Sequence, residues 1–206
     1  RSLHASPGDL VHEDLPLGMR VLRDELARGV ERVLVDDAGE LGRLQQFVND
    51  FIPEGAPRLE LHAGPRPIFD LHGIEEEINR ALERKVTLKS GGYLVIDQTE
   101  ALVAIDVNSG KMASEKGVEA TATKSNLEAA TEVGRQLRLR DLGGLIVIDF
   151  IDMRERKNNR LVEDEVKRSL ANDKARVSVG RISKFGLLEM SRQRIKATLT
   201  QGSHLP

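Results

Sequence analysis

The hydrophobic pattern along the first third of the chain predicts a small unit of helices and short strands. Apolar residues recur at helical spacing over residues 18–27 and again over residues 38–51, where Pro53 ends the second helix. The segments 30–35 and 58–62 carry the short apolar or alternating runs that are typical of strands. This part of the chain therefore reads as a small α/β unit.

The pattern changes from helix to sheet between residues 73 and 106. A helix is predicted over residues 73–84, with an apolar stripe and a mostly charged outer face. Residues 85–88 are interpreted as a bridge between two subdomains. Two apolar runs, 93–97 and 101–106, are joined by a short link, which predicts an antiparallel hairpin. The apolar stripe of the helix consists of Ile74, Ile78 and Leu82.

The second half of the chain predicts a central buried strand that follows a long helix. Residues 109–124 hold few large apolar side chains, so a mobile loop is expected there. Ser125 and Glu128 have the spacing of a capping box, which predicts that a helix begins at Ser125 and stops at the glycine pair 143–144. The run 145–150 is the most apolar in the sequence and predicts a central strand.

The last elements complete a mixed arrangement. Residues 159–172 have the apolar spacing of a helix and residues 176–182 that of a strand, and residues 187–196 are expected to form a short helix rich in basic residues. Helices and strands are thus interleaved along the chain. The predicted fold class is α/β or α+β, with a mixed sheet flanked by helices.

Composition narrows the class of protein. Hydrophobic residues make up 39% and charged residues 31% of the 206 positions, proportions typical of a soluble globular protein. Cysteine is absent, which excludes a disulfide or a thiolate zinc site within these residues. The longest apolar runs are far too short to cross a bilayer, and the N-terminal residues lack a signal-peptide core. A cytoplasmic protein is therefore expected.

The formal net charge of −2 argues against a protein that grips nucleic acid by bulk positive charge. Basic residues do cluster in the segments 135–140, 154–160 and 184–196, although such runs are more often solvated faces. One tyrosine, no tryptophan and five phenylalanines offer little material for stacking bases. Any contact with RNA or DNA is expected to be mainly to the backbone, or to be completed by another domain.

Two acidic strand endings carry the candidate chemistry. Asp106 and Asn108 lie two residues apart, so they share a face of an extended strand, and Asp149 comes from a second strand of the same sheet. Carboxylates within apolar runs are costly unless something satisfies them, and these oxygen donors suit Mg²⁺ bound to a substrate phosphate. The pattern predicts a magnesium site for phosphodiester chemistry. The alternative, that these residues are helix caps or turn formers, stays open from spacing alone.

Four motifs resemble the catalytic core of the bacterial ribonuclease E/G family. The match is dense over residues 90–195 and weaker over residues 9–89. The resemblance implies a ribonuclease H-like subdomain over residues 1–89, followed by a deoxyribonuclease I-like catalytic subdomain over residues 90–206. The motifs run from Gly91 to Ser109, from Asn126 to Ala130, from Arg135 to Met153 and from Phe185 to Arg194.

The resemblance also implies an activity and assigns residues to it. Asp106 and Asp149 would be the Mg²⁺-binding carboxylates, and Asn108 would help to orient the metal ion or the scissile phosphate. The expected reaction is internal cleavage of single-stranded, A/U-rich, preferably 5′-monophosphorylated RNA, which leaves a 3′-hydroxyl and a 5′-phosphate, in RNA decay and in rRNA and tRNA processing. Lys111 and Arg176 are candidate RNA contacts, each with the alternative of an ordinary surface residue.

The family's catalytic half contains parts that this sequence lacks. It has an S1-type RNA-binding domain and a pocket that senses the 5′-monophosphate, and it continues after the position of Pro206 into a Cys-Pro-x-Cys motif whose zinc joins two protomers. The resemblance therefore implies a piece of a longer protein. That protein would form a dimer or tetramer, bind Zn²⁺ and contact other RNA-decay proteins.

Two other functions stay open from the sequence. The chain could act mainly as a scaffold for protomer pairing or for other RNA-processing proteins, because the RNA-gripping parts are missing. A DNA nuclease of deoxyribonuclease I type is disfavoured, because no histidine general base lies near either aspartate motif. Metal-dependent cuts in an A/U-rich oligonucleotide would distinguish the enzyme from the scaffold.

Overall fold

The computed structural model describes residues 15–26, 29–52, 54–110 and 117–195. The chain forms two compact units, which divide between Glu75 and Glu76. The sequence predicted a subdomain boundary between residues 89 and 90, which is further along the chain than this division. Residues 85–87, interpreted from the sequence as part of a bridge, form a strand that pairs within the sheet of the second unit.

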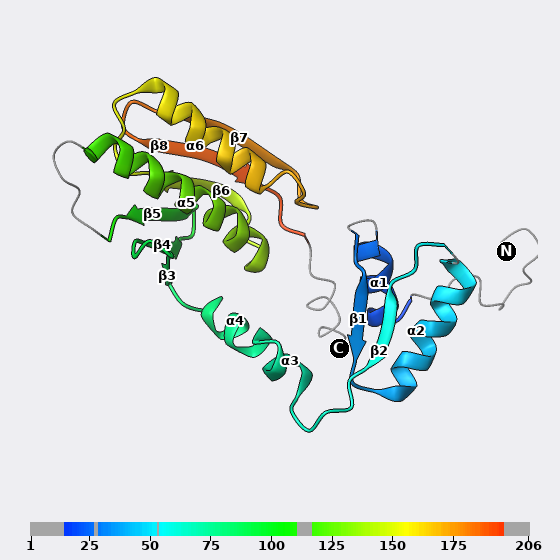
Figure 1. Ribbon diagram of the computed structural model, residues 1–206. Coiled ribbons are helices and arrows are strands. Elements are labelled where there is room, and N and C mark those ends of the chain that lie inside the picture. The colour runs from blue at the N-terminus through cyan, green and yellow to red at the C-terminus, as the bar shows by residue number, and fades with distance from the viewer. Residues whose placement is uncertain (1–14, 27–28, 53, 111–116, 196–206) are drawn as a thin grey trace, which may run out of the picture. The chain divides into compact units, whose positions relative to one another are not determined.

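The first unit packs helices against a two-stranded parallel sheet (Figure 1). Asp37 caps the second helix, because its side chain accepts a hydrogen bond from the backbone N–H of Glu40 at 2.8 Å. The two helices and two strands predicted in this region from periodicity are confirmed. They are α1 (Leu17–Leu26), β1 (Arg32–Val35), α2 (Ala38–Phe51) and β2 (Arg58–Leu61), and α3 (Ile68–Leu71) follows. The buried core is Leu22, Leu44, Phe47 and Val48.

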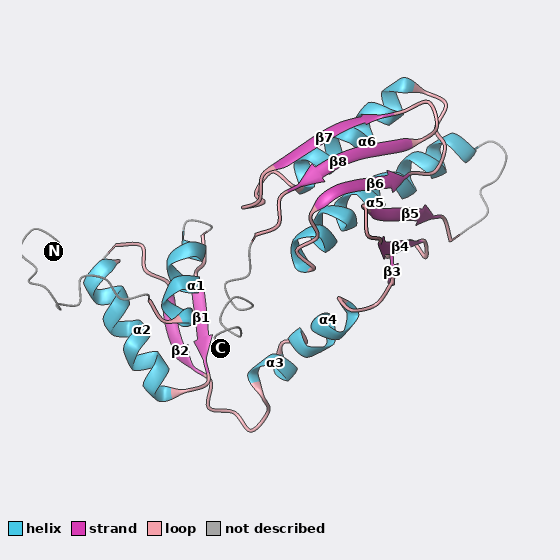
Figure 2. Ribbon diagram, turned by 180° about the vertical axis from the view of Figure 1, so that it is seen from behind, coloured by secondary structure: helices cyan, strands magenta, loops and turns pink. Residues whose placement is uncertain are grey.

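The second unit is built around a six-stranded mixed sheet with the order β3-β4-β5-β6-β8-β7 (Figure 2). Strands β5 and β6 are parallel, and the other neighbouring strands are antiparallel. The predicted mixed class is thus confirmed. Among the helices of the described residues, none has the length and apolar character needed to span a bilayer. The elements are α4 (Ile74–Arg80), which begins just before the division, β3 (Lys85–Thr87), β4 (Tyr93–Gln98), β5 (Val103–Asn108), α5 (Val118–Leu139), β6 (Gly144–Asp149), α6 (Arg156–Ser169), β7 (Val177–Ile182) and β8 (Leu187–Arg192).

Alternating side chains give the six-stranded sheet two different faces. One face carries buried apolar residues that pack against α5 and α6. The intervening residues, among them Asp106, Asn108 and Asp149, lie on the opposite face, called the outer face below. The core between sheet and helices includes Leu94, Ile96, Val103, Ile105, Val107, Ile146, Ile148, Leu188 and Met190 from the strands and Ala129, Val133, Leu137, Val162 and Val166 from the helices.

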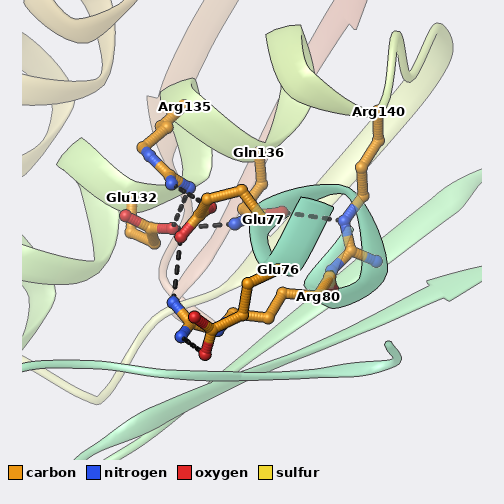
Figure 3. Close-up of polar contacts among 7 residues, drawn as sticks. All are labelled: Glu76, Glu77, Arg80, Glu132, Arg135, Gln136 and Arg140. Carbon is orange, nitrogen blue, oxygen red and sulfur yellow. Dashed lines mark hydrogen bonds and ion pairs between the residues drawn. The ribbon is translucent and has the colours of Figure 1, made fainter. Parts of the chain in front are cut away.

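Helix α4 contacts α5 through charged and polar side chains (Figure 3). Glu77 accepts hydrogen bonds from Arg80 at 2.9 Å and from Arg135 of α5 at 2.5 Å. The sequence predicted a mostly charged outer face for this helix, and Glu75, Glu76 and Arg80 are indeed exposed. Ile78, which belongs to the predicted apolar stripe, is exposed as well. The residues of the network are Glu76, Glu77, Arg80, Glu132, Arg135, Gln136 and Arg140.

Residues 187–192 form strand β8, so the helix predicted over 187–196 is wrong for this part. The strand pairs with β6 on one side and β7 on the other, and its alternate side chains Leu188, Met190 and Arg192 are buried. Arg192 obscured the two-residue period in the sequence, because a charged side chain is rarely buried. Its guanidinium is 1% exposed and pairs at 2.8 Å with Asp173, which is 2% exposed.

Helix α5 begins at Val118, so the start predicted at Ser125 is wrong. Glu128 does not close a capping box, since its carboxylate accepts a hydrogen bond from the backbone N–H of Ser90 at 3.0 Å. Residues 118–124, predicted as part of a loop, are helical. Residues 111–116 lie outside the described residues, and the loop predicted there stays a prediction.

Candidate active site

The carboxylates of Asp106 and Asp149 lie side by side at the carboxyl ends of two neighbouring strands. Strands β5 and β6 are parallel, and their register pairs Asp106 directly with Asp149. Neighbouring strands are about 4.8 Å apart. Both side chains are exposed on the outer face, because Ile105 and Ile148, one position earlier in each strand, point into the core. Strand pairing therefore brings together two residues that the sequence could only assign to the same sheet.

Asn108 completes the group from the end of β5. Its Nδ2 donates a hydrogen bond to Oδ2 of Asp106 at 3.1 Å. The bond restricts the rotation of the Asp106 carboxylate, and both residues lie on the same strand, β5. The three residues predicted from their spacing thus lie together at the carboxyl-terminal ends of the central strands β5 and β6.

The site concentrates negative charge. Burial raises the pKa of Asp149 above its ordinary value, and the negative charges of Asp106 and Asp152 raise this pKa further. Asp152 is exposed and lies in the segment that follows β6. A cation bound near these carboxylates would relieve their mutual repulsion.

The donor set suits a hard divalent cation. Mg²⁺ usually binds proteins through one or two carboxylates and keeps several waters or substrate phosphate oxygens as its other ligands. Asp106 and Asp149 provide two carboxylates, and Asn108 adds an amide. Within the part of the chain that the structure describes, no group of three or more histidine, aspartate or glutamate side chains forms a metal cage. The residues present therefore fit an ion that shares its coordination with water and substrate.

Asn126 of α5 holds the segment that follows Asp149. Its side chain is fully buried, and it makes two hydrogen bonds to one residue: Nδ2 donates to the carbonyl oxygen of Ile151 at 2.8 Å, and Oδ1 accepts from the N–H of Ile151 at 3.0 Å. Sequence reasoning missed this residue. A polar side chain on the inward face of an amphipathic helix was the signal, since such a residue needs a partner.

Glu119, near the start of α5, binds the same segment further along. Its carboxylate accepts hydrogen bonds from the backbone N–H groups of Arg154 at 3.0 Å and Glu155 at 3.1 Å, and from Nδ2 of Asn158 at 2.8 Å. The bonds from Arg154, Asn158 and Glu155 lower the pKa of Glu119. Two residues of α5 thus hold the chain in place directly after a candidate metal ligand.

Glycines allow the backbone on the other side of Asn108 to pack closely. A Cβ at Gly110 would lie 2.0 Å from the carbonyl oxygen of Gly91, and a Cβ at Gly92 would lie 2.6 Å from the carbonyl oxygen of Asn108. Gly91 itself has a φ of 93°, which side chains rarely tolerate. The turn before β4 therefore supports the end of β5 by direct backbone contact.

The structure places Arg176, one of the two candidate RNA contacts, away from the carboxylates. Arg176 is exposed and precedes β7. The first residue of β7, Val177, pairs with Arg192 at the end of β8, and Arg192 pairs with Gly144 at the start of β6. Asp149 ends β6, so roughly 17 Å of strand separates it from the level of Arg176. Lys111 lies outside the described residues. Contact of either residue with RNA stays a prediction.

The chain is similar to ribonucleases E and G. The model of the ribonuclease E/G family matches residues 1–195. The chain is 44% identical over 195 residues to ribonuclease E of Haemophilus influenzae, an alignment that covers 95% of this chain and 21% of that protein. It is 43% identical over 189 residues to ribonuclease G of Escherichia coli strain K12, covering 92% of this chain and 39% of that protein. For ribonuclease E of the same strain the identity is 44% over 196 residues, covering 95% of this chain and 18% of that protein.

Proposed function

The chain belongs to the ribonuclease E/G family, and from this premise we propose that it provides the catalytic core of a Mg²⁺-dependent endoribonuclease. The proposed substrate is single-stranded RNA, A/U-rich and preferably 5′-monophosphorylated, and the products carry a 3′-hydroxyl and a 5′-phosphate. The proposed setting is RNA decay and rRNA and tRNA processing in the cytoplasm. The observation that carries the proposal is the register pairing of Asp106 with Asp149 on the outer face.

The chemistry assigns a role to each residue of the site. Asp106 and Asp149 would hold the cation near the ends of β5 and β6, and a phosphate of the RNA would bind through that cation. When bound, Mg²⁺ polarises a phosphoryl oxygen and lowers the pKa of a water molecule that can attack phosphorus. Asn108 orients Asp106 through their 3.1 Å hydrogen bond. Burial raises the pKa of Asp149, and the negative charges of Asp106 and Asp152 raise this pKa further; a bound cation would relieve that repulsion.

Rigid support of these residues also favours catalysis. A charge that develops in the transition state is stabilised best by groups that need not reorganise. Asn126 and Glu119 restrain the segment after Asp149, and the Gly91–Gly92 backbone supports the end of β5. The carboxylates themselves are exposed, so an RNA phosphate can approach them from the outer face.

Replacing either carboxylate by its amide tests the proposal. In the protein that carries this chain, Asp106→Asn and Asp149→Asn are each expected to slow Mg²⁺-dependent cleavage of a 5′-monophosphorylated A/U-rich oligonucleotide at least ~100-fold, because each removes a preorganised charge at the reacting phosphate. EDTA is expected to stop the wild-type reaction. Glu100→Gln removes one carboxylate from the exposed turn between β4 and β5 and is the matched control, with an unchanged rate.

Two outcomes would contradict the assignment. Near-wild-type cleavage by a folded Asp106→Asn or Asp149→Asn variant would exclude the two carboxylates from the chemistry. Intact RNA in the presence of Mg²⁺, together with tight pairing of the wild-type chain with itself, would favour a scaffold instead of an enzyme.

Beyond RNA, we propose as partners further copies of the protein, in a dimer or tetramer, and other RNA-decay proteins. The 206 residues contain no cysteine. A thiolate zinc link between protomers would therefore need ligands from outside this sequence. Zinc has no role in the chemistry proposed for Asp106 and Asp149.

A further inference from the structure

Two aromatic side chains lie at the same end of the strands as the two carboxylates, one on each side of them. Tyr93 is the first residue of β4 and pairs with Asn108 at the end of β5. Phe185 lies in the turn that leads into β8, and the first residue of β8 pairs with Asp149. Because the strands follow the order β4-β5-β6-β8, Tyr93 lies beyond Asp106 on one side and Phe185 lies beyond Asp149 on the other.

Tyr93 shares the outer face with the site. The buried residues of β4 are Leu94 and Ile96, so the side chain of Tyr93 points to the face opposite the core. Residues directly opposite in an antiparallel pair have Cβ atoms about 5 Å apart, and diagonal neighbours are about 7–8 Å apart. Tyr93 is therefore next to Asn108 and one diagonal step from Asp106. The ring can contact a nucleotide whose phosphate lies at these residues.

Each aromatic ring has a lysine over its face. Nζ of Lys85 lies 4.2 Å from the ring centroid of Tyr93, and Nζ of Lys184 lies 5.0 Å from that of Phe185. Both lysines are exposed, and Phe185 is 72% exposed. These ring faces are thus covered by flexible, solvated side chains and not by core packing. A ligand can displace a lysine from a ring without disturbing the fold.

The lysines also supply charge that the site otherwise lacks. Asp106, Asp149 and Asp152 are carboxylates, so an RNA backbone would need cations on both sides of the ion that Asp106 and Asp149 would hold. Lys184 and Arg154 line a hollow of about 210 Å³ that also contains Asp152. Two cations against one carboxylate leave this hollow net positive and suited to a phosphate group.

We infer that Tyr93 with Lys85, and Phe185 with Lys184, form two stacking subsites for the nucleotides on either side of the scissile phosphate. Each ring takes one base on its face, and the lysine that it releases contacts a neighbouring phosphate. Stacking of this kind tolerates any base, because every base has a π-face. It also requires bases that are free of a duplex, which agrees with a single-stranded substrate. The identity of the ligand rests on the proposed function.

The tyrosine itself reports on one subsite. The chain has a single tyrosine and no tryptophan, so its intrinsic emission comes from Tyr93. Titrating the 206-residue chain with a single-stranded A/U oligonucleotide in EDTA is expected to quench this emission. An oligonucleotide of equal length made of abasic nucleotides has no bases to stack and is expected to leave the emission unchanged. Light absorbed by the bases of the A/U oligonucleotide is measured separately with free tyrosine amide.

Leucine substitutions test the contribution of each ring to affinity. Tyr93→Leu and Phe185→Leu keep an apolar side chain but lose the aromatic face, and each is expected to raise the Kd for a labelled oligonucleotide about 5-fold or more, measured by fluorescence anisotropy in EDTA. Tyr93→Phe keeps the ring and is expected to bind like the wild type. Leu161→Ala removes an exposed apolar side chain from α6 and serves as the matched control, with an unchanged Kd.

Unquenched Tyr93 emission would overturn the inference, and so would wild-type affinity in both Tyr93→Leu and Phe185→Leu. Because binding is read in EDTA, these results do not depend on cleavage. Quenching by RNA that stays intact in Mg²⁺ would uphold the subsites and contradict the proposed function. Cleavage in Mg²⁺ without quenching or loss of affinity would uphold the function and contradict the subsites.

Discussion

Asn126→Ala removes the two hydrogen bonds that hold the segment after Asp149. Asn126 is 0% exposed, and its bonds to the carbonyl oxygen and the N–H of Ile151 measure 2.8 and 3.0 Å. After truncation both backbone groups lose their partner, and an unsatisfied buried polar group costs about 1–3 kcal/mol. Ile151 is only partly buried, so water can replace part of the loss. We therefore expect the free energy of unfolding to fall by about 2–4 kcal/mol for the two groups together.

Urea unfolding followed by tyrosine emission measures this loss. Tyr93, the single tyrosine, lies in the same compact unit as Asn126, so its emission reports the unfolding of that unit. With a urea m-value of about 2 kcal/mol per molar, the midpoint is expected to fall by about 1–2 M. Asn172→Ala removes an exposed asparagine from the turn after α6 and is the matched control, with an unchanged midpoint.

The same variant is expected to affect turnover under conditions where it is fully folded. Because the restrained segment continues directly from Asp149, we expect kcat to fall about 10- to 100-fold, the scale of a displacement of about 1 Å at a reacting centre. The KM for RNA is expected to change little, since Asn126 is buried and does not face the substrate. A midpoint and an m-value equal to those of the wild type would refute the reasoning, because the two bonds would then contribute nothing.

Two further predictions concern the support of the sheet. Asp173→Asn leaves the buried Arg192 guanidinium without its closest carboxylate, and we expect a loss of about 3 kcal/mol at neutral pH. Burial alone would raise the pKa of Asp173, but hydrogen bonds from the Arg192 guanidinium and the Ala175 N–H hold this pKa below its ordinary value. The stabilisation is therefore present above the ordinary pKa of an aspartate and is lost as the pH falls through the lower pKa of the folded state. Urea unfolding over a pH series measures this, and a difference that does not shrink in acid would contradict it. Gly110→Ala places a Cβ 2.0 Å from the Gly91 carbonyl oxygen and is expected to speed hydrogen exchange at the end of β5. Gly42→Ala, whose Cβ meets nothing within 4 Å, is the control. Unchanged exchange in Gly110→Ala would disprove the close contact.

The candidate carboxylates could be recognised from the sequence because their signal is local. Asp106 and Asp149 end apolar runs, and a charge in such a position needs a partner whatever the rest of the fold. The two-residue spacing of Asp106 and Asn108 also assigned them to one strand face. The residues that support the site gave a weaker signal. Asn126 and Glu119 bind backbone and side-chain groups that lie 25 to 39 positions away in the chain.

Predictions from short sequence windows were wrong where a residue binds a partner that is distant in the chain. Glu128 has the spacing of a helix cap, but it binds Ser90 of a distant turn, and the helix starts earlier. Arg192 interrupts the alternation of apolar and polar residues in the sequence of β8, yet it is buried because it pairs with Asp173. Ile78, from the predicted apolar stripe of α4, is exposed, while Glu77 of the same helix pairs with Arg135 of α5. In each case the deciding contact joins residues that no short window of sequence contains.

The low aromatic content of the chain also took on a different meaning in three dimensions. One tyrosine and five phenylalanines in 206 residues are little material for a platform, yet Tyr93 and Phe185 are brought to the same end of the sheet from segments far apart in the chain. Composition counts such residues, whereas strand order decides whether they meet a site.

By itself, the sequence determined that β4, β5 and β6 are strands and which of their side chains share a face, because these properties follow from a period of two residues along the chain. The tertiary structure alone decided which strands are neighbours and in what register. Strands β5 and β6 are joined through α5, and only their parallel pairing sets Asp106 opposite Asp149. Register depends on packing the whole apolar face of the sheet against α5 and α6 at once, which is a property of the folded core and not of either strand.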